Sequence, residues 1–236
     1  MAFVHGKSTT VFVDAVDFST YFNNVDSTAM ADVSESTTFG KTSKTYIAGN
    51  KDGTISVSGF FDATADATLQ PLLGGNVFVL TVGFDGLDAT DSCIFGKGNI
   101  TNYGQSSPTA EIVATAIDMQ STSGLFNGSV LENATYTSTS NGTARDYGAS
   151  TGNGGGGFLI VSSASGTSPT LDAKITHSAD DTTYADLLTF TQATSTTAEV
   201  KTVAEGTTVN RYLKAVFTIG GTSPSFTAIV GFGRNN

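Results

Sequence analysis

Apolar and polar residues alternate in short runs along the whole chain, which predicts a mainly β protein. In the clearest of these runs, Ile55 and Val57 fall on one face of an expected strand. The opposite face would carry Thr54, Ser56 and Ser58. Further strands are expected over residues 9–14, 77–82, 92–103, 109–120 and 126–136, and the 77–82 run is apolar on both faces, as a strand buried on both sides would be.

Two short segments have helical character. Residues 64–73 carry helix-forming Ala and Leu and end at two glycines, and Pro71 should shorten this helix. Asp17 would cap a single helical turn over residues 17–22. Residues 25–38 are polar with scattered apolar positions and predict no regular element, and a long loop is expected to follow over residues 39–50.

A break in composition divides the chain. Apolar residues vanish and glycine accumulates over residues 141–157, which predicts a flexible linker. We therefore expect a first domain over residues 1–140 and a C-terminal β-sandwich domain over residues 158–236. If so, removal of residues 158–236 should leave the assembly of the first domain intact. The expected strands of the second domain are residues 158–161, 171–177, 187–190, 198–203, 212–219 and 226–232.

The chain is acidic and poor in charged residues. Eleven basic against 21 acidic residues give a formal net charge of −10, with no local run of Lys or Arg. Since nucleic-acid binders take most of their affinity from basic residues, tight DNA binding is not expected. Cys93 is the single cysteine, so no intrachain disulfide can form. The N-terminus has no secretory signal pattern and no apolar run is long enough to span a bilayer, so a soluble product made in a cytoplasm is expected.

Several residue groups suggest a catalytic or ligand site, and each lacks part of the required pattern. Gly40-Lys41-Thr42 is like the end of a phosphate-binding loop, but Glu35 stands where that loop needs its first glycine. Residues 152–157 have the glycine spacing of a dinucleotide fingerprint, but they neither follow an expected strand nor open a helix. Both patterns therefore favour ordinary loop and linker segments.

The titratable residues likewise form no recognisable site. His5, His177 and Cys93 are too few and too separated for a zinc site. The acidic groups lack the spacing of a calcium loop, and a carboxylate pair for glycoside hydrolysis needs a separation that a sequence does not give. These groups are Asp180, Asp181 and Asp186; Asp85, Asp88 and Asp91; and Glu35, Asp62 and Asp66. We therefore expect no catalytic residue, no metal ligand, no cofactor and no enzymatic activity.

Residues 37–62, TTFGKTSKTYIAGNKDGTISVSGFFD, carry three motifs in a row. These are a Thr-Thr-Phe-Gly-x-Thr-Ser-Lys loop, a Tyr-Ile-x-Gly-x-Lys-Asp turn and an alternating strand that ends in Gly-Phe-Phe-Asp. Together they resemble the tail tube (major tail) protein of long, flexible-tailed bacteriophages. Residues 177–190 and 210–234 resemble, less closely, the small β-sandwich appended to many phage virion proteins.

The resemblance implies a fold and an assembly. It implies a tail-tube-type β-barrel or sandwich domain with one or two short helices, and hexameric rings stacked into a tube through which DNA passes without tight binding. Each subunit would give about four strands to a shared inner barrel of roughly 24 strands. With strands spaced about 4.8 Å apart and tilted about 40°, such a barrel closes at a backbone diameter of about 50 Å. The implied partners are further copies of the chain, the tape measure protein and the neck-side and tip-side tail proteins, with no membrane. The implied location is the virion tail, after synthesis in the host bacterial cytoplasm.

The resemblance also assigns roles to residues. The loop that would reach the adjacent ring contains Phe39, Lys41, Lys44 and Tyr46. Lumen-facing candidates are Thr54, Ser56, Ser58, Asn99, Thr101, Glu111 and Asp118. Because Glu111 and Asp118 have opposite parity, a β-bulge would be needed to place both in the lumen.

A second hypothesis belongs to a different class. The chain would be a carbohydrate-binding adhesin of a phage or cell surface, with Tyr184 and Tyr212 as stacking platforms. The absence of Trp weighs against sugar stacking. An enzyme such as a tail-associated hydrolase has no supporting residue constellation.

Overall fold

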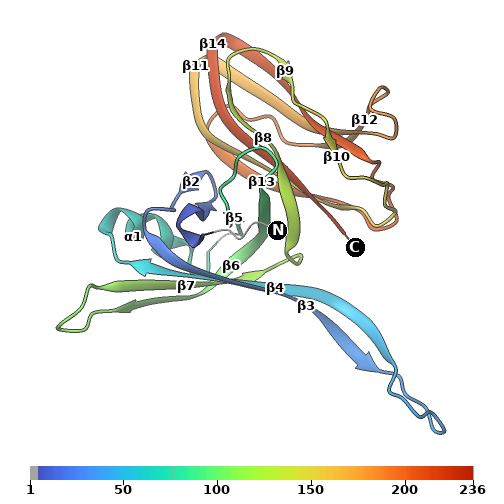
Figure 1. Ribbon diagram of the computed structural model, residues 1–236. Helices are drawn as coiled ribbons and strands as arrows, with labels where there is room; N and C mark the ends of the chain where they lie inside the picture. Colours follow the sequence, from blue (N-terminus) through green and yellow to red (C-terminus); the bar gives the residue numbers. More distant parts are fainter. Residues whose placement is uncertain (1–4, 76, 236) are drawn as a thin grey trace. The chain divides into compact units, whose positions relative to one another are not determined.

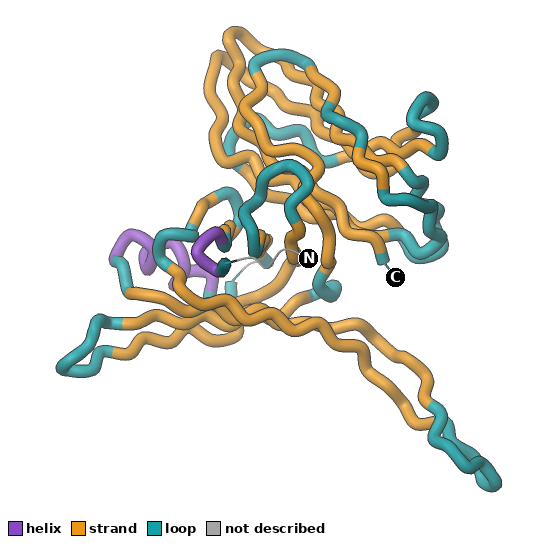
Figure 2. Tube along the Cα trace, viewed as in Figure 1, coloured by secondary structure: helices purple, strands orange, loops and turns teal. Residues whose placement is uncertain are grey.

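The computed structural model describes residues 5–75 and 77–235. The protein is mainly β, as expected, with one short α-helix (Figure 2). The chain forms two compact units. Unit 1 comprises Met1–Ser19, Val79–Phe95 and Phe126–Asn236, and unit 2 comprises Thr20–Phe78 and Gly96–Leu125. Neither unit is continuous in sequence, so this division does not follow the expected boundaries at residues 140 and 158.

Unit 2 is an antiparallel sheet of four long strands (Figure 1). These strands are β3 (Phe22–Glu35), β4 (Tyr46–Phe60), β7 (Ala114–Ser121) and the part of β6 (Ser92–Ser106) from Gly96 onward, in the spatial order β3-β4-β7-β6. The β3–β4 hairpin and the β6–β7 hairpin turn at opposite ends of the sheet (Figure 1). No pattern of apolar and polar residues indicates β3, because neither face of its outer half is buried and its residues therefore do not alternate.

One face of this sheet is packed. Ile55 and Val57 of β4 are buried, opposite Met119 and Ile117 of β7. Helix α1 (Ala63–Leu69) contributes Ala65 and Leu69 to the buried residues of the same unit, and it passes into a 3-10 turn, η2 (Gln70–Leu72), at Pro71. The expected helix is therefore confirmed, together with its shortening by proline. Asp62 caps it by accepting hydrogen bonds from the backbone N–H groups of Thr64 and Ala65.

Unit 1 contains the remaining elements. They are the 3-10 turn η1 (Gly6–Ser8), β1 (Thr10–Val13), β2 (Val16–Asp17), β5 (Phe78–Gly83), β8 (Phe126–Tyr136), β9 (Ser140–Asn141), β10 (Arg145–Asp146), β11 (Gly155–Ser178), β12 (Ala185–Thr189), β13 (Thr197–Val203) and β14 (Tyr212–Arg234). The helical turn expected at residues 17–22 is wrong. Asp17 ends β2, and its carboxylate accepts a hydrogen bond from the Ser19 backbone N–H, so the capping geometry closes a turn between strands.

Strands β11 and β14 form one long antiparallel pair, where four short strands were expected. The expected breaks lie at two matching segments, Gly166-Thr167-Ser168-Pro169 and Gly221-Thr222-Ser223-Pro224. In both, the glycine and the serine have positive φ, with values of 121° and 48° in the first and 108° and 49° in the second. Thr167 pairs with Thr222, and the register shifts on either side of it, so the paired segments form a double bulge that bends both strands without interrupting them.

The hydrophobic core of unit 1 explains this bend. Leu159 and Val161 precede the double bulge in β11, and Leu171, Ala173 and Ile175 follow it, yet all five belong to one buried cluster. The two halves of the β11–β14 pair therefore fold toward one another across a common core. A second cluster covers the other face of the first half of β11, where Phe158 and Ile160 pack with Phe95 and Phe126.

The glycine-rich segment is part of this core. Gly155, Gly156 and Gly157 are buried and open β11, pairing with β13 on one side and β14 on the other. A Cβ atom on Gly156 would lie 2.8 Å from the Phe126 ring, and one on Gly157 would lie 2.9 Å from the Ile175 Cδ1 methyl group. The expectation of a linker is therefore wrong over these three residues, because the glycines make room for neighbouring side chains.

Candidate assembly surface of the four-stranded sheet

The second face of the unit 2 sheet is polar and partly open to solvent. Residues of β4 alternate strictly, so that Thr54, Ser56 and Ser58 are half-buried on this face while Ile55 and Val57 are buried on the other. The strand register aligns further polar residues with them. These are Asn24, Asp26 and Thr28 of β3, Asp52 of β4, Asp118 and Gln120 of β7, and Asn99 and Asn102 of β6. We call this set, with Thr54, Ser56 and Ser58, the polar face.

Hydrogen bonds across strands organise the polar face around Asp118. The Ser56 hydroxyl donates to Asp118 Oδ1 at 2.6 Å, and the Asn102 amide donates to Asp118 Oδ2 at 2.9 Å. These two donors lower the pKa of Asp118 below its usual value of 3.8, so the carboxylate stays ionised. A second pair joins Gln120 to Asp52, with the amide donating to Oδ1 at 2.5 Å. The side chains are thus fixed by one another while remaining accessible to water.

The polar face has an excess of negative charge. Asp26, Asp52 and Asp118 lie on it, and strand alternation adds one cation, Lys97, near its edge. Asp26 accepts a hydrogen bond of 2.8 Å from the Asn24 amide. No cation in the described structure forms an ion pair with this carboxylate. A surface of this kind favours water and repels phosphate.

Six of the seven expected lumen-facing residues lie in the sheet as follows. Thr54, Ser56, Ser58, Asn99 and Asp118 share the polar face, and Thr101 lies at a register shift in β6, where its hydroxyl donates to the Asp118 carbonyl oxygen at 3.2 Å. Glu111 lies apart from them. The expected strand over residues 109–120 begins only at Ala114, and Glu111 belongs to the preceding turn, where its N–H donates to the Pro108 carbonyl oxygen. The parity conflict with Asp118 therefore disappears without a bulge at Glu111.

The outer half of the β3–β4 hairpin projects beyond the packed part of unit 2 (Figures 1 and 2). Every residue from 29 to 51 is exposed except Thr37, which is intermediate. We call residues 29–51 the arm. It carries large apolar side chains with no cover, including Val33, Phe39, Tyr46 and Ile47, and the relative exposure of Phe39 is 108%.

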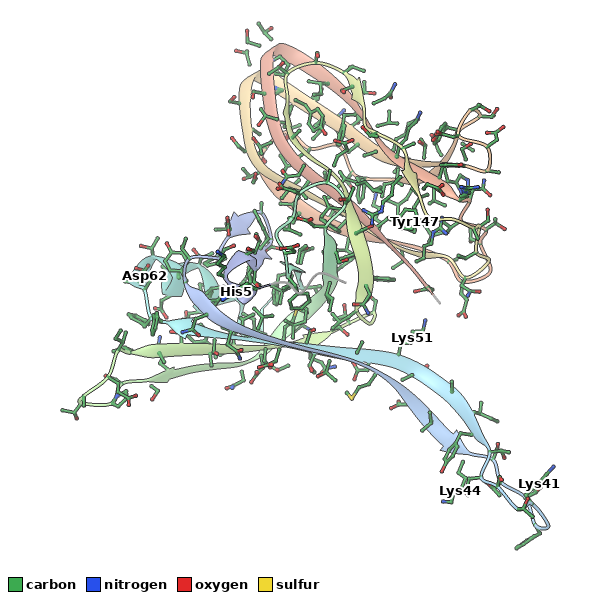
Figure 3. All side chains as sticks on the ribbon, in the orientation of Figure 1. His5, Lys41, Lys44, Lys51, Asp62 and Tyr147 are labelled. Atoms are coloured by element: carbon green, nitrogen blue, oxygen red, sulfur yellow. The ribbon has the colours of Figure 1, made fainter. Side chains whose placement is uncertain are left out.

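The tip of the arm is held by its own hydrogen bonds. Ser36 N–H donates to the Thr45 carbonyl oxygen at 2.8 Å, and Thr45 N–H donates to the Thr37 hydroxyl at 3.0 Å. Lys44 forms an ion pair with Glu35 at 2.8 Å, and this pair lowers the pKa of Glu35. Lys41 and Lys44 lie at the far end of the hairpin (Figure 3). Phe39, Lys41, Lys44 and Tyr46 are thus together at the tip or just below it.

Strand β3 leaves one edge of the sheet open. Among the described residues it pairs with β4 alone, over the register from Asn24–Ser58 to Glu35–Tyr46. An edge of this length carries a row of backbone N–H and C=O groups that can pair with another strand. This open edge, the polar face and the arm all belong to the same sheet.

Sequence reasoning missed part of this surface. Asp26, Asp52, Asn102 and Gln120 were not singled out, although Asp52 continues the alternation of Thr54, Ser56 and Ser58 by one more step. Asp26 lies in β3, which had no detectable pattern. Only the pairing of strands shows that it lies opposite Ser56.

The other candidate residues have structural roles. Glu35 pairs with Lys44, Asp62 caps α1, and Asp66 accepts hydrogen bonds from Tyr103 and Gln105. Burial lowers the pKa of His177, whose Nδ1 accepts a hydrogen bond from Asn210 N–H. Asp180 accepts hydrogen bonds from the backbone N–H groups of Thr182 and Thr183, which lower its pKa and close a turn.

The two tyrosines considered as sugar platforms each have a cation over the ring. Lys214 Nζ lies 3.6 Å from the Tyr184 ring centroid, and the Arg211 guanidinium lies 4.8 Å from that of Tyr212. Within the described part of the chain, no group of three or more His, Cys, Asp or Glu side chains is placed to hold a metal ion, and no helix has the length and apolar character needed to cross a membrane.

Comparison with known proteins gives similarity at the level of structure. Neither a family model nor a curated protein matches the chain. A chain from the virion of a native gene transfer agent particle is similar with a TM-score of 0.43 and 16% identity, covering 52% of this chain and 97% of that one. The SPP1 tail tube protein is similar with a TM-score of 0.42 and 14% identity over 52% of this chain and 78% of its own.

A third structure covers more of the chain. The SPP1 Dit protein, described as a hub of the adsorption apparatus, has a TM-score of 0.41 and 9% identity over 97% of this chain and 99% of its own. Scores and identities of this size describe partial similarity in structure. A phage tail tube protein, the kind of protein that residues 37–62 resemble, is thus among the structures to which the chain is similar.

Proposed function

We propose that this chain is a structural virion protein that assembles with copies of itself into stacked hexameric rings, and that these rings form a phage tail tube through which DNA passes. The single observation that carries the proposal is the construction of the unit 2 sheet. It is packed on one face, polar and acidic on the other, and open along the edge of β3.

The open edge favours pairing between copies. An unpaired strand of this length promotes uncontrolled association unless a specific partner covers it. If a neighbouring copy supplies that partner through a different strand, the contact is heterologous, and a heterologous contact generates a ring when its rotation closes. With four strands per copy, a six-fold ring has roughly 24 strands, enough for a wide lumen.

The polar face would line that lumen. Asp26, Asp52 and Asp118 bring carboxylates close to passing DNA, and screening at physiological salt extends over about 8 Å, so only such wall residues act on the phosphates. Thr54, Ser56, Ser58, Asn99 and Thr101 would supply neutral polar groups. The wall would therefore hold water and release DNA.

The arm would join one ring to the next. Its large apolar side chains are more than half exposed, and its tip keeps its own hydrogen bonds, so it is a preformed element with apolar groups that a neighbour can cover. Burial of Phe39 and Tyr46 against a neighbouring ring would stabilise stacking, and Lys41 and Lys44 would meet acidic groups there.

The remaining parts of the proposal concern partners and place. Residues 158–236 would decorate the outside of the tube, and the tape measure, neck-side and tip-side tail proteins would contact its lumen and ends. The location would be the virion tail, after synthesis in the host bacterial cytoplasm. No catalytic step is proposed.

Electron microscopy of the concentrated chain tests the proposal. The wild-type chain should form tubes of stacked rings with six-fold symmetry, while Phe39→Ser should shorten or abolish tubes without lowering the melting temperature, because Phe39 has no packing within the subunit. Ile112→Ser is the matched control, since Ile112 is an exposed apolar residue in the turn at the other end of the sheet. A wild-type chain that remains monomeric at high concentration would refute the proposal, and equal loss in both variants would refute the role of the arm.

A further inference from the structure

A pocket of about 430 Å³ in unit 1 has a concentration of positive charge that the assembly proposal does not use. Its lining includes Arg145, Arg234, Tyr147, Cys93 and Ser129. The chain has only three arginines, Arg145, Arg211 and Arg234, and two of them line this one pocket. In a chain with a net charge of −10, such a grouping needs a physical reason.

Both pocket arginines have unused hydrogen-bond donors. Arg145 Nη1 and Arg234 Nε are buried and have no hydrogen-bond partner among the described residues. A buried donor without a partner is costly, and the cost is greater for a charged group. The other nitrogens of Arg234 are engaged, because Nη1 donates to the Ala149 carbonyl oxygen and Nη2 donates to the carbonyl oxygens of Asn210 and Arg211.

Both guanidinium groups lie over the ring of Tyr147, which is labelled in Figure 3. The guanidinium carbon lies 5.3 Å from the Tyr147 ring centroid for Arg145 and 4.4 Å for Arg234. The ring is itself fixed by a hydrogen bond of 2.7 Å between its hydroxyl and the Ser129 hydroxyl. The pocket is therefore preorganised, with two cations stacked on one aromatic side chain.

No carboxylate of the described chain neutralises this pair. Asp146 is engaged by Arg211 in two hydrogen bonds, of 2.6 and 2.5 Å, and acts on Arg234 only at longer range. Asp91 likewise acts on the nearby Cys93 through space, with no ion pair to either pocket arginine. The positive charge of Arg145 and Arg234 is therefore available to an anionic ligand.

We propose that this pocket binds an oxyanion, a phosphate or carboxylate group, between Arg145 and Arg234. Guanidinium N–H groups make strong charge-assisted hydrogen bonds to both oxyanions, and each arginine offers one unused nitrogen, Nη1 of Arg145 and Nε of Arg234. Ser92 and Asn127 add neutral donors at the rim. The site does not depend on tube formation.

Calorimetric titration of the full-length chain with sodium phosphate, with citrate and with sodium chloride of equal ionic strength tests the site. Phosphate or citrate should bind saturably with a dissociation constant of about 1 mM or lower, and chloride should not. Arg145→Gln should weaken binding by roughly tenfold or more. Lys174→Gln is the control, because it removes one positive charge from unit 1 at a surface pair with Asp186 and should leave binding unchanged. Phosphate heats equal to those of chloride, or an Arg145→Gln variant that binds as tightly as the wild type, would overturn the site.

Cys93 gives a second readout that needs no arginine variant. It is the only thiol of the chain, and it is buried at the pocket, so a neutral alkylating reagent reaches it only when this part of unit 1 opens. An anion bound in the pocket stabilises the closed state and should therefore slow the alkylation. An alkylation rate that phosphate leaves unchanged would contradict occupancy. Sedimentation with and without phosphate then separates two sources of the oxyanion. A fall in self-association would identify an acidic group of a second copy as the natural occupant, and an unchanged association would identify a free anion.

Discussion

Gly156 lies where an aromatic ring leaves no space for a larger residue. Three ring atoms of Phe126 would each lie 2.8 Å from a Cβ at this position, and Phe126 is itself stacked on Phe95. Gly156 belongs to a glycine-rich segment that looks like a flexible linker, but the core can close only because this residue has no side chain. Whether a neighbouring glycine tolerates substitution depends in the same way on the space around its Cα atom.

Gly156→Ala should lower the free energy of unfolding by about 1–3 kcal/mol, because the added methyl group overpacks a closed core. Gly152→Ala is the matched control, since a Cβ there meets nothing within 4 Å. Urea unfolding of both variants measures the difference. Equal free energies of unfolding for the two variants would show that the core near Phe126 accommodates the added methyl group at little cost.

Asp118 makes a pH dependence measurable on the polar face. Its pKa is lowered in the folded chain, so its bonds to Ser56 and Asn102 stabilise the fold above about pH 4 and are lost as the pH falls from there through the folded pKa. Asp118→Asn should therefore be less stable than wild type at pH 7, and the gap should narrow below about pH 4. Unfolding curves at pH 7 and pH 3 measure it. A difference in stability between the two proteins that is the same at pH 7 and pH 3 would mean that Ser56 and Asn102 do not stabilise the ionised carboxylate.

At the scale of elements, the double bulge of β11 and β14 shows how two strands stay paired while both bend. Gly166 lies against Ser223 and Pro224 of the opposite strand, where a Cβ would approach the Ser223 carbonyl oxygen to 2.8 Å. Gly221 lies in the same way against Ser168 and Pro169, at 2.7 Å from the Ser168 carbonyl oxygen. The contacts are reciprocal, so each bulge accommodates the other.

Gly166→Ala should destabilise unit 1 more than Gly206→Ala. Both glycines have positive φ, 121° and 85°, so both variants incur backbone strain, but a Cβ at Gly206 meets nothing within 4 Å. The strain alone is worth about 1 kcal/mol, and the clash at Gly166 adds to it. Thermal unfolding compares them. A smaller effect at Gly166 would mean that the opposing strand moves away at little cost.

The elements also show which parts of the fold a sequence can reveal. The strand Phe78–Gly83 and the α1 helix were predicted because their signals are local, an apolar run in one and helix formers followed by Pro71 in the other. The long β11–β14 pair was divided into four strands in the sequence prediction, because Ser-Pro and Gly-Gly are turn signals unless a matching segment lies opposite. Of the polar face, the β4 residues were predictable from alternation, whereas Asp26 required knowledge of a pairing between distant segments.

At the scale of the whole molecule, the segment after residue 157 is needed by the segment before it. Strand β14 pairs with β8 from Phe226–Tyr136 to Phe232–Ser129, and with β9 and β10 as well. The core cluster that contains Leu131 and Tyr136 is otherwise built almost entirely from later residues. The expectation that a truncated chain keeps its assembly therefore does not follow from this structure.

Removal of residues 158–236 should abolish the cooperative unfolding transition of unit 1 and expose apolar surface that binds a hydrophobic dye. The physical reason is the loss of β11 and β14, which supply most of one core cluster and Phe158, Ile160 and Ile229 of the other. Calorimetry and dye binding of residues 1–157 measure the outcome. A truncated chain that unfolds cooperatively and still polymerises would restore the original view of two separable domains.

The reciprocal contacts at the double bulge have a consequence for evolution. Gly166 of β11 faces Ser223-Pro224 of β14, and Gly221 of β14 faces Ser168-Pro169 of β11. A substitution in one tetrapeptide therefore requires a compensating substitution in the other. Residues 166–169 and residues 221–224 lie far apart in the sequence, yet substitutions in the two segments should covary among related proteins.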